Sequence, residues 1–355
     1  MQSIANLVKE FKEGGQYYIF CSDTDLNGAG LENISTGQWT KFNDHTLVWY
    51  ANHEKISDSL VKQVETIKPD VLYIIGIYSW HFNIVPLLYC KAPKKILSTR
   101  GMLHPGALSQ KKWKKKIYLT VFKLMEYQHK VQFHATDAEE QQYISNYFGK
   151  DVGISIAGNF SNNIALLPLA GKKPGSLKMI SIALISPMKN ILKVLQALEK
   201  ITDHIQYDIY GPVKDHDYLR LCKEQAKLLP QNIVVAWRGE LQPTDISNAL
   251  EGAHIFILPS KSENFGHAIY EALSAGRPVI TSHNTPWQNL MPSKAGVNVE
   301  SPLELKDAIL FFATMDSNEL AHWSHKSREY AERAVDVENI KKQYEKMFFG
   351  ADKEA

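Results

Sequence analysis

Two glutamates, Glu263 and Glu271, lie eight positions apart in the segment SENFGHAIYEALSAGRPVI, which covers residues 262–280. A carboxylate has two acceptor oxygens, so each glutamate could hold a pair of neighbouring hydroxyl groups on a sugar or a ribose. Two surface acids beside a helix would show the same spacing. The residues around the pair therefore have to decide between a ligand site and an ordinary surface.

The local pattern predicts a strand, a loop and a helix. The run AHIFILPS, residues 253–260, is an apolar strand that ends in Pro-Ser. Apolar residues at helical spacing then predict a helix that begins near Phe265 or Gly266 and ends at Gly276. The first glutamate thus comes just before the helix, and the second lies about one turn inside it.

The predicted start of this helix suits an anion. Backbone N–H groups around Phe265, Gly266 and His267 can receive a phosphate oxygen, and the helix dipole adds about 0.3–1 kcal/mol of attraction. Gly266 has no side chain to hold an anion away. Phosphate at the helix start, sugar hydroxyls on one side and ribose on the other are the parts of a nucleotide sugar. The segment therefore predicts nucleotide-sugar binding.

The whole chain predicts two α/β domains. Its 355 residues exceed a comfortable single core. Apolar strand-like runs alternate with helical stretches from end to end, which is typical of parallel sheets covered on both faces. We expect two doubly wound, Rossmann-like domains that face each other across a cleft, at residues 1–157 and 177–335. Residues 158–176 form the expected linker, and residues 336–355 a final helix that can return to the first domain.

The beginning of the chain departs from this scheme. The first residues predict a helix, whereas a doubly wound domain normally opens on a central strand. We therefore expect that the first domain lacks its opening strand and that the natural coding frame begins upstream of Met1.

Longer stretches of the sequence resemble a known family. The pattern P-S-x-x-E-x-F-G, followed by E-A-x3-G-x-P-V-I, runs from Pro259 to Ile280 and is similar to the signature of retaining family-four glycosyltransferases of the kind that build bacterial surface polysaccharides. Other matching segments follow one another along the chain: STRGMLHPGAL (98–108), SPMKN (186–190), IYGP (209–212) and WRGEL (237–241). Each piece alone is weak, but their order is specific. The resemblance implies the GT-B fold of two facing Rossmann-like domains.

The resemblance also implies a reaction and residues for it: transfer of a sugar from a nucleotide-sugar donor to a polysaccharide or lipid-linked acceptor, with retention of configuration. Glu271 would hold the donor ribose, Glu263 the hydroxyls of the transferred sugar, and Lys189 the departing phosphate, where charge stabilisation usually dominates. The other expected site residues are Asn264, Phe265, Gly266 and His267 as backbone donors to the diphosphate, Glu240 and Leu241 beside the base, and His104 in the acceptor cleft. A structural loop histidine explains His104 equally well.

One departure from the family pattern leaves alternatives open. The family carries Gly-Arg before the Lys189 segment, and here those positions are Ala183 and Leu184. A lost charge-assisted contact costs about 1.5–3 kcal/mol, unless Arg100 or Arg238 substitutes. A catalytically weak nucleotide-sugar-binding subunit, or a nucleotide-sugar epimerase of the same architecture, therefore remains an alternative to the transferase.

A basic, acid-free window predicts a membrane contact. No acidic residue occurs between Asp70 and Glu126, and five lysines crowd six positions: Lys111, Lys112, Lys114, Lys115 and Lys116. Trp113 lies among them and starts an apolar helical stripe, which a helix that covers the sheet would also show. Without acidic partners the lysines repel one another, and anionic lipid would relieve that repulsion. We expect this patch to dock reversibly on anionic membrane and to bring a lipid-linked acceptor to the first domain.

Other partners are not expected from the sequence. No His/Cys cluster has ligand spacing, so we expect no metal and no cofactor; Asp23 and Asp25 in SDTD are the competing metal site. The three scattered cysteines suit a reducing compartment. We expect a cytoplasmic protein, peripheral on the inner face of the plasma membrane, and no nucleic-acid partner.

Overall fold

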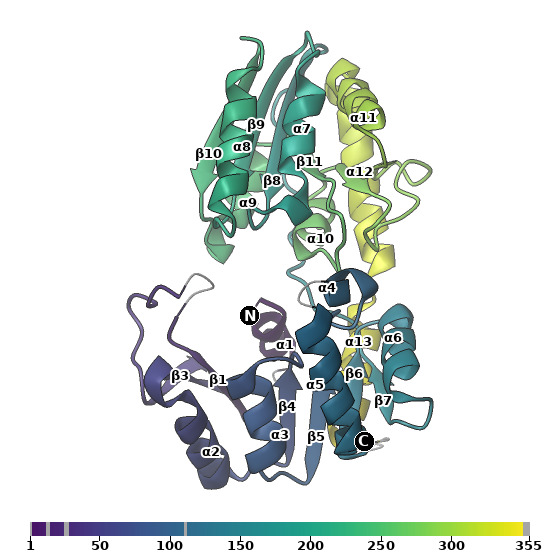
Figure 1. Ribbon diagram of the computed structural model, residues 1–355. Helices are drawn as coiled ribbons and strands as arrows, with labels where there is room; N and C mark the ends of the chain where they lie inside the picture. The colour runs from purple at the N-terminus through teal and green to yellow at the C-terminus, as the bar shows by residue number, and fades with distance from the viewer. Residues whose placement is uncertain (1, 12–14, 25–27, 110–111, 351–355) are drawn as a thin grey trace. The chain divides into compact units, whose positions relative to one another are not determined.

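The computed structural model describes residues 2–11, 15–24, 28–109 and 112–350, and the chain divides into two compact units (Figure 1). Unit 1 takes in Met1–Phe160 together with Val337–Ala355, and unit 2 takes in Ser161–Asp336. Both are α/β units in which all neighbouring strands but one pair are parallel; that pair, residues 39–43 and 46–51, is in unit 1.

Unit 2 contains a six-stranded sheet in the order β10-β9-β8-β11-β12-β13, with every neighbouring pair parallel. Its first strand, β8, lies inside the sheet, as in other doubly wound folds. The strands are β8 (Ser176–Ile182), β9 (His204–Tyr210), β10 (Ile233–Gly239), β11 (Ile255–Leu258), β12 (Val279–Ser282) and β13 (Gly296–Val299). The helices are α7 (Ile191–Leu198), α8 (His216–Lys227), α9 (Ile246–Glu251), α10 (His267–Ser274), α11 (Pro302–Thr314) and α12 (Ser317–Ala334).

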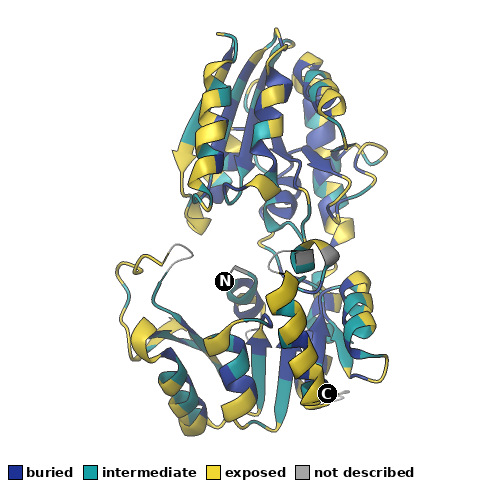
Figure 2. Ribbon diagram, viewed as in Figure 1, coloured by how far each residue is buried: buried dark blue, intermediate teal, exposed yellow. Residues whose placement is uncertain are grey.

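The central strands of unit 2 are continuous apolar runs because helices cover both sides of them. Every residue of β11 and β12 is buried, as Figure 2 shows for the middle of the sheet. Helices α7, α8 and α11 contribute to the main core, and α10 packs against α12. Burial of this kind contributes about 25 cal/mol for each Å² of apolar surface removed from water.

The segment expected as a linker, 158–176, is packed rather than free-standing. Its first residues belong to unit 1, and from Ser161 onward it belongs to unit 2. The fully buried Arg277 donates hydrogen bonds to the carbonyls of Leu167 and Pro168 and to that of Leu250. The carbonyls of this irregular backbone are thus bound by a guanidinium of the same unit.

Unit 1 has two separate sheets instead of one. The first has the order β1-β3-β2, and the second has the order β4-β5-β6-β7. The strands are β1 (Tyr17–Ser22), β2 (Trp39–Asn43), β3 (Thr46–Ala51), β4 (Val71–Ile75), β5 (Lys94–Ser98), β6 (Gln132–Ala135) and β7 (Ile154–Ile156). The helices are α1 (Gln2–Glu10), α2 (Ile56–Ile67), α3 (Val85–Tyr89), α4 (Pro105–Ser109), α5 (Lys112–Leu124), α6 (Ala138–Phe148) and, from the end of the chain, α13 (Val337–Phe349).

The last helix, α13, is part of the unit 1 core. Tyr344 stacks on Phe160, and Phe11, the residue after α1, contacts both Tyr344 and Phe348 edge-on. His134 of β6 is buried beside them; its Nε2 donates to the Ala157 carbonyl, and its Nδ1 is hydrogen-bonded to the hydroxyls of Tyr73 and Ser98. Burial lowers the pKa of His134 to about 3, so its ring is neutral at physiological pH.

Candidate functional site

Two loops at the carboxyl ends of β8 and β11 are joined to each other. Asn190 adopts a left-handed backbone conformation, with φ of 55°, and its side chain donates to the Pro259 carbonyl over 2.8 Å. The backbone N–H of Lys261 donates to the Met188 carbonyl over 2.8 Å. These bonds hold the segment SPMKN against the end of the strand that leads to Glu263. Ligands of open α/β sheets bind at this kind of edge.

Lys189 and Glu263 form an ion pair, although 74 positions separate them. The Lys189 ammonium lies 2.5 Å from Oε1 of Glu263, and the two side chains are 21% and 11% exposed. The Ser260 hydroxyl donates to the same oxygen over 2.6 Å. A cation that could hold a phosphate and a carboxylate that could hold sugar hydroxyls are thus neighbours before any ligand arrives.

The start of α10 is shaped by Gly266. Its φ of +78° is left-handed, and a side-chain carbon there would lie 3.1 Å from Ile269 and 3.2 Å from the Trp287 ring nitrogen. That ring nitrogen donates to the Phe265 carbonyl over 2.5 Å. The positive end of the helix therefore has a small residue at its edge and a fixed loop before it. Both features allow an anion to approach closely.

Glu271 lies inside α10, one turn beyond His267. Only 4% of Glu271 is exposed, and burial raises the pKa of its carboxyl to about 7. Nδ1 of His267 is 2.5 Å from the Ser161 hydroxyl, at the first residue of unit 2. A buried acid that titrates near neutrality is a common feature of binding and catalytic sites.

Other predicted site residues lie elsewhere. Glu240 is exposed and Leu241 half-buried just after β10, the edge strand, which β9 and β8 separate from β11. His104 belongs to unit 1, where its Nδ1 accepts from the Gly106 N–H over 3.0 Å and its ring meets Tyr143 edge-on. These contacts explain His104 as a loop residue, and the structure leaves its predicted role in the acceptor site untested.

Arg100 and Arg238, the two residues expected to substitute for the missing family arginine, form hydrogen bonds to other residues. Arg100 lies in unit 1 and donates to Asn159 and to the Tyr73 hydroxyl. Arg238 donates to Asp208 over 2.9 Å. Neither contact connects these arginines with the Lys189 and Glu263 pair.

Three residues of the site were given no role by the sequence pattern, although Asn190 and Ser260 lie within matching segments. Ser260 holds Glu263, Asn190 joins the two loops, and Trp287 fixes the Phe265 carbonyl. Ser260 is three positions before Glu263 in the recognised pattern, so its role could have been suggested. The contacts of Asn190 and Trp287 join residues that are far apart in the sequence, and only the fold brings them together.

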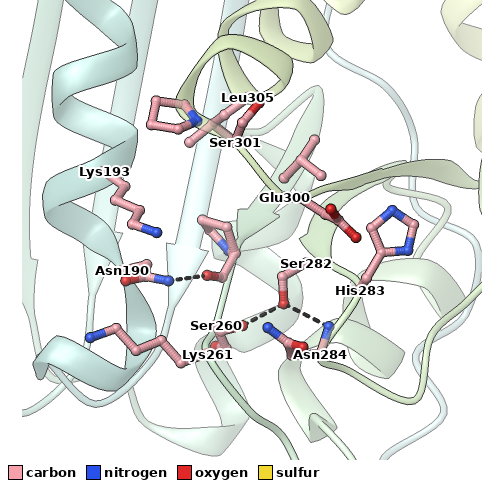
Figure 3. Close-up of a pocket in the computed structure, with 13 residues that line it drawn as sticks. Asn190, Lys193, Ser260, Lys261, Ser282, His283, Asn284, Glu300, Ser301 and Leu305 are labelled. Carbon is pink, nitrogen blue, oxygen red and sulfur yellow. Dashed lines mark hydrogen bonds between the residues drawn. The ribbon is translucent and has the colours of Figure 1, made fainter.

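A cavity of about 310 Å³ adjoins the site (Figure 3). It is lined by the loops after β11, β12 and β13 and by the first turn of α11, and Lys193, Lys261 and His283 are among its side chains. Ser282 connects two of the lining loops, because its hydroxyl donates to the Ser260 carbonyl and accepts from the Asn284 N–H. The cavity shares Asn190 and Ser260 with the site, but Lys189, Glu263 and Glu271 are not part of its lining.

The basic window of unit 1 forms α5, and its apolar stripe faces outward. Trp113 is 77% exposed, Ile117 62% and Leu124 78%, whereas Leu119 and Phe122 on the opposite side are buried. Lys112, Lys114 and Lys116 are exposed beside the stripe. Lys115 points inward instead, with its ammonium 2.6 Å from the Ala107 carbonyl and 5.1 Å from the centre of the Tyr78 ring. Lys111 lies outside the described residues.

The described residues show neither a metal-ligand cluster nor a membrane-spanning helix. Within the ranges that the structure describes, no group of three or more His, Cys, Asp or Glu side chains is placed to hold a metal ion. Asp23 has one buried carboxylate oxygen without a hydrogen-bond partner, and Asp25 lies outside the described residues. None of the described helices is long and apolar enough to cross a bilayer.

Comparison with known proteins identifies the domain that holds the site. Residues 169–329 match the family described as glycosyl transferases group 1. Unit 2 belongs to this family. The Lys189 loop, the Glu263 loop and α10 all fall within the matched residues.

Two curated proteins match part of the chain, and the name of one of them specifies a glycolipid. The chain is 33% identical to alpha-monoglucosyldiacylglycerol synthase of Streptococcus pneumoniae over 155 residues, which are 42% of this chain and 34% of that protein. It is 27% identical to sulfoquinovosyl transferase SQD2 of Arabidopsis thaliana over 100 residues, 28% of this chain and 19% of that protein. The matches thus span about a third and a fifth of these relatives.

Solved structures extend the likeness to both units. Sucrose-phosphate synthase from Thermosynechococcus elongatus superposes with a TM-score of 0.71 at 17% identity, and covers 98% of this chain and 91% of that one. Anabaena Alr3699/HepE, in complex with UDP and glucose, has a TM-score of 0.64 at 16% identity, with 85% of each chain covered. At this identity the likeness concerns the fold, which is the GT-B fold of two Rossmann-like units.

Proposed function

We propose that this protein is a retaining hexosyltransferase that moves a sugar from a nucleotide-sugar donor to a polysaccharide or lipid-linked acceptor. The observation that carries the proposal is the meeting of Lys189 and Glu263 at the start of α10, with Glu271 buried one turn further on, inside a group 1 glycosyltransferase domain. The Lys189 ammonium can bind a diphosphate, and the two carboxylates can accept hydrogen bonds from the hydroxyls of a sugar and a ribose.

Donor binding would exchange the partners of the ion pair. The diphosphate would take the Lys189 ammonium and the positive end of α10, and Glu263 would turn to accept from sugar hydroxyls while Ser260 keeps hold of one oxygen. Glu271 would accept from the two ribose hydroxyls. The acceptor hydroxyl would attack the anomeric carbon from the same face that the donor phosphate leaves, and the departing phosphate would take the proton of that hydroxyl. Attack on this face retains the anomeric configuration.

The substrate classes can be tested on the purified protein with a small set of variants. Calorimetry with uridine, guanosine and adenosine diphosphate sugars identifies the base, and incubation with the accepted donor and a lipid or glycan extract tests transfer. We expect Glu271→Ala to weaken donor binding and Glu263→Ala to lower turnover more than affinity. Glu224→Ala, on the exposed surface of α8, is the matched control.

The outcomes separate the proposal from the alternatives. Wild-type turnover in both site variants would refute the site assignment. Isomerised donor without any acceptor would indicate an epimerase, and tight binding without product would indicate a binding subunit. Nuclear magnetic resonance of the product decides whether the anomeric configuration is retained.

We also propose that α5 of unit 1 docks the protein on the cytoplasmic face of an anionic membrane, where a lipid-linked acceptor resides. The exposed apolar side chains of Trp113, Ile117 and Leu124, beside exposed lysines, form the kind of amphipathic face that lies in a bilayer interface. The diacylglycerol lipid in the name of the Streptococcus pneumoniae relative agrees with such an acceptor. A helix that only covered the sheet would bury this stripe.

Co-sedimentation with anionic vesicles tests the docking. Each basic residue near the surface contributes about 1 kcal/mol, so changing Lys112, Lys114 and Lys116 to Gln should weaken binding about a hundredfold at low salt. The matched control changes three exposed lysines elsewhere: Lys200, Lys223 and Lys346. Equal binding by both triple variants, or none by the wild type, would refute the membrane contact and leave the transferase proposal standing.

A further inference from the structure

The cavity that adjoins the Lys189 and Glu263 pair has no role in the proposed transfer (Figure 3). It lies outside the carboxyl ends of β11, β12 and β13, where ligands of open α/β sheets bind. Its volume of about 310 Å³ is at the lower end of the range of about 300–1,000 Å³ that is usual for small-molecule pockets. A cavity of this size suits a monosaccharide and not a complete nucleotide sugar.

Hydrogen bonds between its loops fix the walls of this cavity before any ligand arrives. The side chains of Asn190 and Ser282 each donate to a carbonyl of the loop after β11. At the start of α11, the Ser301 hydroxyl accepts from the Glu304 N–H and donates to the Glu304 carboxylate. Walls that are already in place lower the cost of ordering the site when a ligand binds.

Four ionisable side chains of the lining take no part in these bonds. Figure 3 shows Lys193 and Lys261 on the side of α7, and Glu300 with His283 on the opposite side. All four are exposed, so a ligand can reach them. Among the described residues, no ion pair includes any of the four. The cavity therefore offers two ammonium groups at one side and a carboxylate at the other.

This separation of charge selects a ligand with two different ends. A phosphate monoester carries a charge of about −1.5 to −2 at pH 7, and two ammonium groups can bind it through charge-assisted hydrogen bonds. A carboxylate accepts hydrogen bonds from hydroxyls and repels a second anionic group. A phosphate at one end and hydroxyls at the other are the parts of a sugar phosphate.

We propose that this cavity binds a monosaccharide phosphate and is a second small-molecule site of unit 2. Lys193 and Lys261 bind the phosphate, and Glu300 accepts from hydroxyls of the sugar. The three residues proposed to hold the donor are not part of the lining, so the two sites are separate. The proposal rests on the residues of the cavity and does not depend on the transferase activity.

Calorimetry on the whole chain at constant salt tests the site. The ligands are the 1- and 6-phosphates of glucose, galactose and mannose, with inorganic phosphate and free glucose for comparison. We expect saturable binding of at least one hexose phosphate, at least about tenfold tighter than that of inorganic phosphate. Changing Lys193 and Lys261 to Gln should weaken it at least about tenfold. The control pair, Lys200→Gln with Lys223→Gln on exposed helix surface, should not.

Glu300→Gln separates a sugar-phosphate site from a simple basic patch. The variant loses a charged acceptor for hydroxyls, so the hexose phosphate should bind about threefold more weakly. Inorganic phosphate should bind equally well or more tightly, because a negative charge has been removed. If both ligands bind more tightly to the variant, the carboxylate does not contact the sugar and the proposed ligand class is wrong.

Three further results would overturn the proposal. The first is the absence of saturable binding by all six hexose phosphates at millimolar concentration. The second is equal weakening by the two lysine pairs, which would indicate nonspecific charge attraction. The third is loss of binding in Lys189→Gln together with displacement by a nucleotide sugar, which would place the hexose phosphate in the donor site. Unchanged binding in Lys189→Gln supports a separate site, even if the protein transfers no sugar.

Discussion

Glu271→Gln should make unit 2 more stable and the protein a poorer binder of donor, because burial raises the pKa of this carboxyl from 4.5 to about 7. Below pH 4.5 the Glu271 carboxyl is protonated in both the folded and the unfolded chain, so its full contribution to the free energy of unfolding is present. Between pH 4.5 and 7 the unfolded chain loses the proton while the folded chain keeps it, and stability falls by about 1.4 kcal/mol per pH unit. The contribution is lost once the pH passes through the folded pKa.

The magnitude follows from the two pKa values. A glutamine cannot ionise, so the variant should match the wild type near pH 4.5 and exceed it at pH 8 by about 3 kcal/mol. Urea denaturation at several pH values, followed by tryptophan fluorescence, measures the difference. The control is Glu224→Gln, whose side chain is 60% exposed and should change stability little at any pH.

Donor binding should respond to the same group in the opposite sense. Ribose hydroxyls donate to an ionised carboxylate, and a pKa of about 7 leaves roughly a tenth of the group ionised at pH 6 and roughly nine tenths at pH 8. Wild-type affinity for a nucleotide sugar should therefore fall about tenfold from pH 8 to pH 6, and the variant should bind weakly at both. Equal affinities of wild type and variant at pH 8 would refute the ribose contact, and a stability difference that ignores pH would refute the raised pKa.

Three other substitutions test the geometry of the site. Lys189→Ala leaves the largely covered Glu263 carboxylate with Ser260 as its remaining side-chain partner. We expect a loss of about 1–3 kcal/mol in stability, measured by denaturation, and at least a tenfold loss in turnover, measured by product formation. Gly266→Ala places a side chain in the left-handed conformation against Ile269 and Trp287, which should lower stability by about 1–2 kcal/mol. It should also weaken nucleotide-sugar binding in calorimetry. Wild-type affinity would contradict the close approach of the diphosphate. Trp287→Phe removes the ring N–H that binds the Phe265 carbonyl. Affinity for the nucleotide sugar should fall by about threefold to tenfold, while circular dichroism should show an intact fold.

The sequence by itself determined the local elements of the donor site. Apolar spacing predicted the strand that became β11 and the helix that became α10, which begins at His267 with Gly266 as the residue before it. It also determined the order of strands and helices along the chain and the family pattern from Pro259 to Ile280. These features depend on residues that are close in sequence, and backbone preferences and helical periodicity act over such short distances.

The tertiary structure decided which of those residues meet and which faces are covered. Lys189 and Glu263 form an ion pair only because β8 and β11 are neighbours in the sheet, and no local pattern records that pairing. The period of α5 predicted an apolar stripe, but only packing shows that Leu119 faces the core while Trp113 faces outward. Contacts between distant segments depend on how whole elements pack, and side-chain spacing within one element does not specify them.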